Sequence, residues 1–547
     1  MASDVPEQVF QDTNVYTRRT PGRGNATFCS KNVKAKSQLM YVAKPLIVAL
    51  ETAELLTHCY FCFRTSGESG LPSYSLEQAR SLKTCSGCKV VRFCDQKCQR
   101  QAWSAYHRLE CKLFARLHPR ILPTNVRGIV RLLKQQEAGK LAEGEWVRLL
   151  ALEAHLDQLR KEGGERWEDL MLMAQATKSY SGSEQSLELI LRLICILTVN
   201  AFTLTSPTLD PLGLALHPST ALLNHSCDPN AFVRFQVLPA SQQPGFAEPG
   251  GISIHALRDI SKNEEITLSY VDNTLPLENR RGELMERYFF RCSCNLCARG
   301  SNTTRDNLHQ TNSMLSDQNG SNLLASKSLR VGRDAIALLL DIESHPGMEQ
   351  TRVDDLNSIM ADLAGTAVWP LYRYPWPQLR HLLLLGLLSS NRYSEALSQS
   401  AILMRAVYPV MHEQQHHPIR MAQLWVLLSI CLYCLEAGIQ GDGSIGEASS
   451  RFRMLGLLHC VLIEFIYRVS HEGARINGAF EDSIDQAYKT IASVSSFWPE
   501  YQQKKGTVIK ATALWLDNQI HDQLRKEGVS QEIIDLSSRG GATLTPS

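Results

Sequence analysis

The amino-acid sequence predicts an α+β protein followed by an all-α C-terminal domain. Residues 231–238 and 251–257 alternate apolar and polar side chains, as half-buried strands do. Apolar repeats with helical spacing occupy residues 113–205 and return beyond residue 326. Spaced cysteines separate these regions. At 547 residues the chain is long enough for about three or four domains.

The composition is that of an ordinary folded protein, with 44% hydrophobic and 20% charged residues. It excludes a wholly disordered or collagen-like chain. The most apolar segments, 187–205 and 455–467, are broken by charge or shorter than the roughly 20 residues of a membrane span. The first residues lack the basic and then apolar pattern of a secretory signal. We therefore expect a soluble protein that is neither secreted nor membrane-bound.

Cysteine usage is the most informative feature of the composition. Eleven of the sixteen cysteines fall into short spaced groups. In an intracellular chain such groups indicate metal sites rather than disulfides. The other five are expected to be buried thiols, and they are Cys29, Cys195, Cys431, Cys434 and Cys460.

The first metal region contains four pairs of ligands, enough to fill two tetrahedral zinc sites with protein groups alone. We expect the first and third pairs to share one ion and the second and fourth the other, although spacing alone does not fix the pairing. In a helix, ligands four residues apart share one face. The pairs are Cys59 and Cys62, Cys85 and Cys88, Cys94 and Cys98, and His107 and Cys111.

This region resembles the MYND zinc finger, including Phe93 before the third pair and the run Gln101-Ala-Trp-Ser-Ala-Tyr-His107. The 22 residues between Cys62 and Cys85 exceed the usual family spacing, and their glycines and proline predict a surface loop. By resemblance, the finger is expected to bind Pro-rich peptides. Residues 80–120 carry ten Lys or Arg against two acidic residues, so weak DNA binding is an alternative.

A second group of motifs lies downstream. It comprises Asn224-His225-Ser226-Cys227, the segment from Glu264 to Tyr270, and the segment from Tyr288 to Cys297. The last of these contains a C-x-C-x2-C triplet, which is one ligand short of a tetrahedral site, and Cys227 can supply the fourth. A third zinc ion would then tie the Asn224-His225 turn to the segment that carries Tyr288 and Phe290. The expected ligands are Cys227, Cys292, Cys294 and Cys297.

With these motifs in this order, the chain resembles methyltransferases of the SET and MYND (SMYD) family, most strongly over residues 15–300. The resemblance implies an α+β SET fold, split by a MYND finger and a helical insert and followed by a tetratricopeptide-like domain. The strict 34-residue repeat signature is absent, although helical patterns cover 378–390, 393–408, 417–437 and 454–467.

The resemblance divides the chain into eight expected parts. They are residues 1–58 (N-terminal SET), 59–111 (MYND), 112–205 (helical insert), 206–280 (core SET), 281–300 (post-SET zinc segment), 301–325 (linker), 326–536 (helical domain) and 537–547 (flexible tail).

The resemblance also implies S-adenosylmethionine as the methyl donor and a protein lysine as the acceptor. Pro21-Gly22-Arg23-Gly24 is similar to the family's glycine-rich turn, although G-x-G alone is weak. A lone helical histidine such as His155 is more often a surface or capping residue. The implied cofactor-binding residues are Gly22, Arg23, His155, Asn200, Asn224, His225, Tyr288 and Phe290.

Tyr270 and Tyr288 are the expected catalytic residues, as walls of an aromatic channel for lysine. The Tyr270 hydroxyl would orient the amine, and the motif contains no strong general base. His225 could serve as a base, but by resemblance we favour binding and orientation. Phe290 is expected to stack on adenine.

Three functions compete at this point. A protein-lysine methyltransferase is favoured because the motif residues are retained. The alternatives are a catalytically weak scaffold or transcriptional co-regulator and a DNA-binding protein. By resemblance we also expect chaperone partners, a monomer, and a location in nucleus and cytoplasm.

Overall fold

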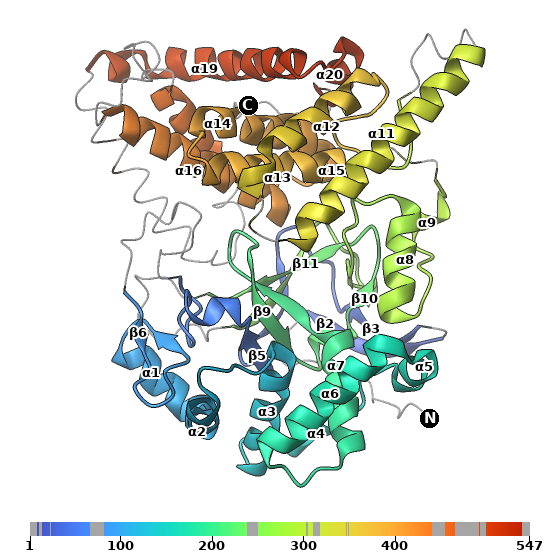
Figure 1. Ribbon diagram of the computed structural model, residues 1–547, viewed down its shortest axis with the longest axis vertical. Helices are drawn as coiled ribbons and strands as arrows, with labels where there is room; N and C mark the ends of the chain where they lie inside the picture. The colour runs from blue at the N-terminus through green and yellow to red at the C-terminus, as the bar shows by residue number, and fades with distance from the viewer. Residues whose placement is uncertain are drawn as a thin grey trace.

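The computed structural model describes residues 8–9, 14–21, 23–65, 81–237, 250–301, 303, 305–309, 318–345, 347, 349–439, 454–464, 489, 492 and 499–538. Small sheets form a core in the middle of the molecule (Figure 1). The cysteine-rich finger (residues 59–111) and a group of helices lie below this core in the view, and the C-terminal helices lie above it.

The sheets join strands from both sides of the finger. Strand β4 (Gln38–Val42) pairs with β12 (Ile252–Ala256), which also pairs with β11 (Ala231–Phe235). Strand β5 (Ile47–Leu50) pairs with β9 (Pro211–Leu216). Early and late segments therefore build one strand core, and residues 51–201 are inserted into it. The two strands predicted at 231–238 and 251–257 are confirmed.

The remaining strands complete this core. Strand β2 (Val15–Thr20) lies between β1 (Gln8–Val9) and β3 (Gly24–Cys29), and all three are antiparallel neighbours. The short strands β10 (Asn224–His225) and β13 (Thr267–Leu268) pair in parallel. This pairing places the Asn224-His225 turn beside the strand that leads to Tyr270.

The finger packs into the strand core. It consists of the hairpin β6 (Lys83–Thr84) and β7 (Arg92–Phe93), followed by α1 (Gln96–Ala102), the π turn η2 (Trp103–His107) and α2 (Arg108–Leu117). Phe61, Val91 and Phe93 share a buried cluster with Leu50 and Leu212 of the strand core. The finger is therefore continuous with this core rather than tethered to it.

The helical insert follows the finger and consists of α3 (Thr124–Glu137), α4 (Glu143–Leu150), α5 (Leu156–Glu162), α6 (Gly164–Ser181) and α7 (Leu187–Asn200). The Ser186 side chain caps α7 by accepting a hydrogen bond from the backbone N–H of Leu189. The expectation of helix as far as residue 205 is wrong. Residues Phe202–Thr205 form strand β8, because the segment finds an antiparallel partner in β9.

Helix α8 (Leu277–Tyr288) and the short α9 (Asn295–Ala298) close the core toward the C-terminal helices. Asp306 Oδ1 accepts a hydrogen bond from the N–H of Leu277 at 2.7 Å. The Asp306 carbonyl accepts two more from Arg373, at 3.0 and 3.2 Å. This connection fixes the start of α8 to the C-terminal helices, and Tyr288 lies at the other end of α8.

The described part of the C-terminal region consists of helices joined by turns and loops, such as residues 366–375 and 412–417. Helix α11 begins at Gln318, so part of the expected linker 301–325 is helical, whereas residues 310–317 lie outside the described residues. Residues 454–464 are also helical, and none of the described helices has the length and apolarity to cross a membrane. The labelled helices are α11 (Gln318–Ser344), η4 (Glu349–Arg352), α12 (Val353–Gly365), α13 (Trp376–Ser389), α14 (Tyr393–Ile402), η5 (Leu403–Val407), α15 (Tyr408–Met411), α16 (Pro418–Ile439), α19 (Pro499–Lys526) and α20 (Gln531–Ser538).

Some predictions fall on segments that the structure does not describe. The long loop between Cys62 and Cys85 includes residues 66–80. The segment between the two predicted strands, residues 239–250, reads as an inserted hairpin tip, and all of it except Gly250 lies outside the described residues. Residues 539–547 of the expected tail lie outside the described residues too, whereas Ser537 and Ser538 end α20.

Candidate active site and zinc centres

The first zinc centre joins the first and third ligand pairs of the finger. The ligand atoms of Cys59, Cys62, Cys94 and Cys98 all lie within 4.8 Å of one another. The spacing of Cys94 and Cys98 is compatible with one helix, but Cys94 lies before the start of α1. It precedes Asp95, whose side chain caps α1 by accepting the Cys98 N–H at 2.8 Å. The cap turns the chain so that both sulfurs face one point.

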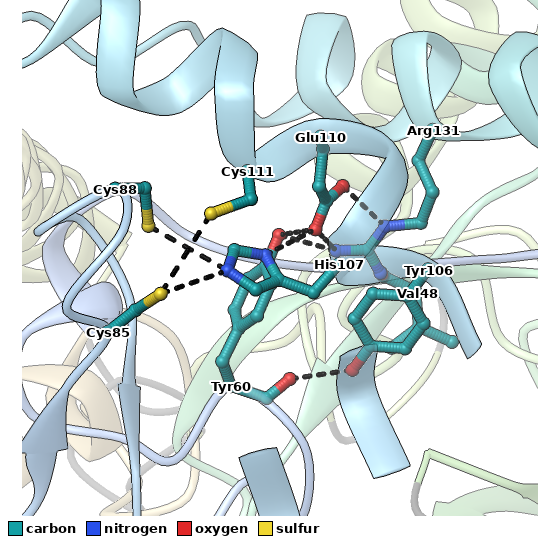
Figure 2. Close-up of polar contacts among 9 residues, drawn as sticks. All are labelled: Val48, Tyr60, Cys85, Cys88, Tyr106, His107, Glu110, Cys111 and Arg131. Carbon is teal, nitrogen blue, oxygen red and sulfur yellow. Dashed lines mark hydrogen bonds and ion pairs between the residues drawn. The ribbon is translucent and has the colours of Figure 1, made fainter. Parts of the chain in front are cut away.

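The second centre joins the second and fourth pairs, as predicted (Figure 2). His107 Nε2 lies 3.4 Å from Cys85 Sγ and 3.8 Å from Cys88 Sγ, and the sulfurs of Cys85 and Cys111 are 3.9 Å apart. A Cβ on Gly87 would lie 3.0 Å from Cys111 Sγ, so any larger residue at this position would crowd a zinc ligand. Three thiol sulfurs and one imidazole nitrogen form a donor set that suits structural zinc.

The third centre confirms the predicted bridge from Cys227 to the cysteine triplet. Cys227, Cys292, Cys294 and Cys297 have ligand atoms within 4.8 Å of one another. A four-sulfur set again suits zinc, which holds such ligands as thiolates. The Asn224-His225 turn and the end of α8 are therefore attached to one metal centre.

The residues around the third centre complement its charge. The guanidinium of Arg280 is fully buried and lies against Cys227 and Cys297. His225 Nδ1 accepts the Tyr270 N–H at 3.0 Å, which leaves the proton on Nε2, 3.2 Å from Cys227 Sγ. His225 thus orients a zinc ligand. This arrangement favours the structural role over that of a base.

Four rings gather beside this centre. The Tyr270 ring centroid lies 4.9 Å from that of Tyr288 and 5.3 Å from that of His225. The Phe290 ring is 5.9 Å from His225 and 6.4 Å from Tyr288. The two expected channel residues are therefore neighbours, supplied by the segment after β13 and by the end of α8.

The Tyr270 hydroxyl has a defined orientation. It donates a hydrogen bond to the carbonyl of Leu223 at 2.5 Å. Burial, and secondarily the nearby Tyr288, raise the pKa of Tyr270 above its ordinary value. Burial also raises the pKa of Tyr288. Both phenols are therefore neutral at physiological pH, and neither is poised as a base.

A carboxylate joins two of the expected cofactor residues. Asn224 Nδ2 donates to Glu265 Oε1 at 2.9 Å, and Arg23 Nη1 donates to Glu265 Oε2 at 2.8 Å. Asn224 Nδ2 also lies 3.2 Å from the carbonyl of Asn25. The glycine-rich turn is thereby fixed to the Asn224-His225 turn, while Gly22 lies outside the described residues.

His155 and Asn200 form a second part of the site. Asn200 Nδ2 donates to the carbonyl of Glu153 at 2.8 Å. His155 stands at the start of α5 in a left-handed conformation, with φ at 49°, rather than inside a helix. The His155 ring lies 5.0 Å from the ring of Phe289. Because Phe289 stands between Tyr288 and Phe290 in the sequence, the segment 288–290 contacts both parts of the site.

Comparison with known proteins agrees with this geometry. A family model described as SET domain matches residues 24–271. The chain therefore contains a SET domain. It is 27% identical over 380 residues to the SET domain and MYND-type zinc finger protein 6 of Schizosaccharomyces pombe, covering 69% of this chain and 64% of that protein. The SET match runs across the finger and helical insert, in accord with the shared sheets on either side.

Two further relatives are named as lysine methyltransferases. Human histone-lysine N-methyltransferase SMYD3 is 31% identical over 225 residues, or 40% of this chain and 49% of that protein. Zebrafish (Danio rerio) N-lysine methyltransferase SMYD2-A is 30% identical over 282 residues, or 51% of this chain and 58% of that protein. The chain thus spans 49% to 64% of the length of these three curated relatives.

Sequence analysis did not single out several residues of the candidate site and of the finger's second zinc centre. Glu265 belongs to a quoted motif, but nothing in the sequence pairs it with Asn224. The sequence does not mark Glu153, because Glu153 contacts Asn200 through its backbone carbonyl. It does not mark Arg280 either, because the role of Arg280 depends on its burial beside the third metal centre. Glu110, between two zinc ligands, could have been noticed by its position.

Proposed function

We propose that this protein methylates lysine side chains of other proteins, with S-adenosylmethionine as the methyl donor. The observation that carries the proposal is the Tyr270–Tyr288 ring pair, 4.9 Å between centroids, beside the zinc-anchored Asn224-His225 turn. The names of the lysine-methylating relatives support it.

An aromatic channel addresses the main chemical obstacle. A free lysine has a pKa of about 10.4, so roughly one side chain in a thousand is neutral near physiological pH. The amine must lose its proton before it can attack a methyl group. The partly buried rings of Tyr270 and Tyr288 disfavour the charged ammonium by desolvation and so lower the lysine pKa. The proton leaves to water.

Tyr270 can then orient the amine. Because its hydroxyl proton is directed to the Leu223 carbonyl, the phenol oxygen keeps lone pairs that can accept an N–H from lysine. Such a contact fixes the direction of the nitrogen lone pair relative to the methyl group. Tyr270 therefore acts by orientation rather than by proton abstraction.

The expected cofactor residues fit a polar ligand. S-adenosylmethionine, when bound, supplies the methyl group on a sulfonium. We propose that the side chains of Arg23, Asn200 and Asn224 and the backbone of His225 hold its polar groups, together with Gly22. The buried Nδ1 of His155 has no hydrogen-bond partner among the described residues, as expected of a site that a polar ligand completes. We propose that Phe290 stacks on adenine, with Tyr288 beside it.

We further propose that the other domains recruit protein partners. Consecutive helices α12, α13, α14 and α16 pack against one another, which supports a tetratricopeptide-like arrangement. The finger would take Pro-rich peptides, and the helical domain would take chaperones and help to select the substrate. A monomer working in nucleus and cytoplasm fits this role.

The test is methyl transfer by the purified protein. Labelled S-adenosylmethionine, with a panel of histones and a cell extract, should give labelled protein that releases methyl-lysine on hydrolysis. If the protein binds S-adenosylmethionine yet labels nothing, the scaffold function is favoured. Specific retardation of DNA without labelling would favour the nucleic-acid alternative.

A further inference from the structure

The edge of one SET sheet is covered by two arginines of the helical insert. Strand β5 is the outer strand of the sheet β5-β9-β8. Arg131 Nη1 donates to the Val48 carbonyl at 2.5 Å, and Arg127 Nη2 donates to the Leu50 carbonyl at 2.7 Å. The donors lie one turn apart on α3 and the acceptors two residues apart on β5, so the spacings match. These bonds satisfy carbonyls that the edge would leave unpaired.

The packing of α3 on β5 is close. A Cβ on Gly128 would lie 3.0 Å from Ile47 Cγ2, so a larger residue would push the helix away from the strand. Both arginines are almost completely buried, with Arg127 2% and Arg131 7% exposed. A displacement of either guanidinium would therefore leave buried carbonyls without a hydrogen-bond donor, which is unfavourable.

Arg131 also reaches the finger (Figure 2). Its Nε and Nη2 donate to the two oxygens of Glu110 at 3.1 and 3.2 Å, and Nη2 donates to the Tyr60 hydroxyl at 2.5 Å. The Tyr60 hydroxyl in turn donates to Glu110 at 2.7 Å. Glu110 is 1% exposed, so this is a buried ion pair whose partners depend strongly on each other.

Glu110 faces the zinc centre on its other side. Its Oε1 lies 3.5 Å from His107 Nδ1, while His107 Nε2 points at Cys85 and Cys88. A carboxylate behind a metal-binding histidine holds the ring and its tautomer and strengthens the ligand. The chain of contacts thus runs from the zinc ligands through His107, Glu110 and Arg131 to the β5 carbonyl.

We propose that Glu110 is a positioning residue that holds His107 on zinc and, through Arg131, couples this finger site to the edge of the SET sheet. Zinc retention in the finger therefore depends on a side chain of the helical insert. Conversely, loss of zinc from this site loosens the packing of α3 on β5. The coupling is independent of whether the protein methylates anything.

The first test measures zinc release into an excess of the colorimetric chelator 4-(2-pyridylazo)resorcinol. In Glu110→Gln we expect one of three zinc equivalents to leave on the order of ten times faster or more, with the other two unchanged. Release of all three zinc ions at wild-type rates would overturn the proposal. This holds even if the variant unfolds at a lower temperature, because the Glu110–Arg131 ion pair would then stabilise the fold without holding zinc. Equal acceleration of all three would indicate general unfolding and would overturn it too.

A matched pair of variants on α3 tests the coupling from outside the finger. Arg131→Lys keeps a cation but cannot hold both Glu110 oxygens and the Val48 carbonyl. It should accelerate the same single equivalent and serves as the decisive variant if Glu110→Gln does not fold. Arg127→Lys is the control, because Arg127 bonds to Leu50, Thr52, Leu122 and Thr124, all outside the finger. Equal zinc release from both lysine variants would refute the coupling.

Hydrogen exchange gives a readout in the opposite direction. Withdrawal of zinc from the His107 site of the wild type should increase amide exchange in residues 47–50 and 127–131. The Arg127→Lys protein should show the same increase on zinc withdrawal, whereas Arg131→Lys should show little further change. Unaltered exchange in the wild type after zinc withdrawal would contradict the proposed connection.

Discussion

Glu265 accepts a hydrogen bond from the Asn224 side chain, with 2.9 Å between Oε1 and Nδ2. Among the described residues, both side-chain hydrogen bonds of Asn224 use Nδ2, so neither of them occupies Oδ1. The second oxygen of Glu265 pairs with Arg23, which is half exposed. One carboxylate therefore sets the orientation of two residues from opposite ends of the SET domain.

Substitution of Asn224 tests the cofactor site directly. Asn224→Ala removes a polar contact from a half-buried position, so S-adenosylmethionine binding should weaken by about 1–3 kcal/mol, roughly tenfold to a hundredfold. Isothermal titration calorimetry on the folded variant measures the change. Unaltered affinity would displace Asn224 from the site.

Glu265→Gln should weaken binding through Asn224 and Arg23 rather than by contact. The amide N–H group of the glutamine would face either Arg23 or Asn224, and both of these residues are hydrogen-bond donors. We therefore expect the affinity for S-adenosylmethionine to fall by about tenfold. In the double variant with Asn224→Ala the two losses should not add, because both act on one network. Glu264→Gln is the control, since Glu264 pairs instead with Arg258 and Asn230. Equal effects from both glutamine variants would contradict the arrangement.

Tyr270→Phe separates enzyme from scaffold. The ring and its contacts with Tyr288 remain, whereas the oxygen proposed to orient the amine is lost. Deletion of an organised polar group at a reacting centre typically costs about a hundredfold or more in rate. We expect cofactor affinity within a few fold of the wild type and methyl transfer nearly abolished. Wild-type rates in a radiolabel assay would show that the proposed role of Tyr270 is wrong.

Metal content tests the three centres together. Elemental analysis of the purified protein should find about three zinc ions per chain, because each centre is closed by four protein ligands. Chelation should unfold the finger and weaken S-adenosylmethionine binding, since the third centre holds the Asn224-His225 turn. Two or fewer ions in fully folded protein would exclude one of the centres.

The zinc centres could be predicted from the sequence for a physical reason. Metal ligands need fixed residue types at short spacings, and a closed set of four leaves few alternatives. Cys227 was assigned to a triplet 65 residues away simply because the triplet lacked one ligand. Tyr270 and Tyr288 followed by resemblance.

The charged contacts could not be predicted in the same way. Glu110 meets Arg131 because α2 of the finger packs against α3 of the helical insert. Glu265 meets Arg23 because the strand core closes across the insertion. Local sequence carries no sign of such partners. Strand β8 was missed because its apolar pattern continues that of α7, and its identity depends on pairing with β9. The left-handed backbone of His155 likewise depends on tertiary contacts.

A group of histidines links the C-terminal helices to the SET core. The rings of His412 and His417 stack with centroids 4.0 Å apart, and His416 reaches the backbone of Ala256 and Leu257 at the end of β12. Burial, with His416 and Arg420 nearby, lowers the pKa of His417 to about 3. Burial, with Lys36 nearby, lowers the pKa of His416 to about 4. All three are therefore neutral in the folded protein at pH 7.

This arrangement predicts loss of stability in mild acid. In the unfolded chain a histidine has a pKa of about 6.5, so below that pH the unfolded state binds protons that the folded state excludes. The free energy of unfolding then falls as the pH falls from about 6.5 toward the folded pKa values, by up to about 1.4 kcal/mol per pH unit for each histidine. His417→Gln should reduce this slope by about that amount between pH 6 and pH 5, as measured by urea unfolding followed by circular dichroism. The wild-type protein, measured in the same buffers, is the control. Other groups that titrate in acid are common to the variant and the wild type, so the difference between the two slopes isolates His417. Identical slopes for the variant and the wild type would show that His417 does not set the acid sensitivity of this junction.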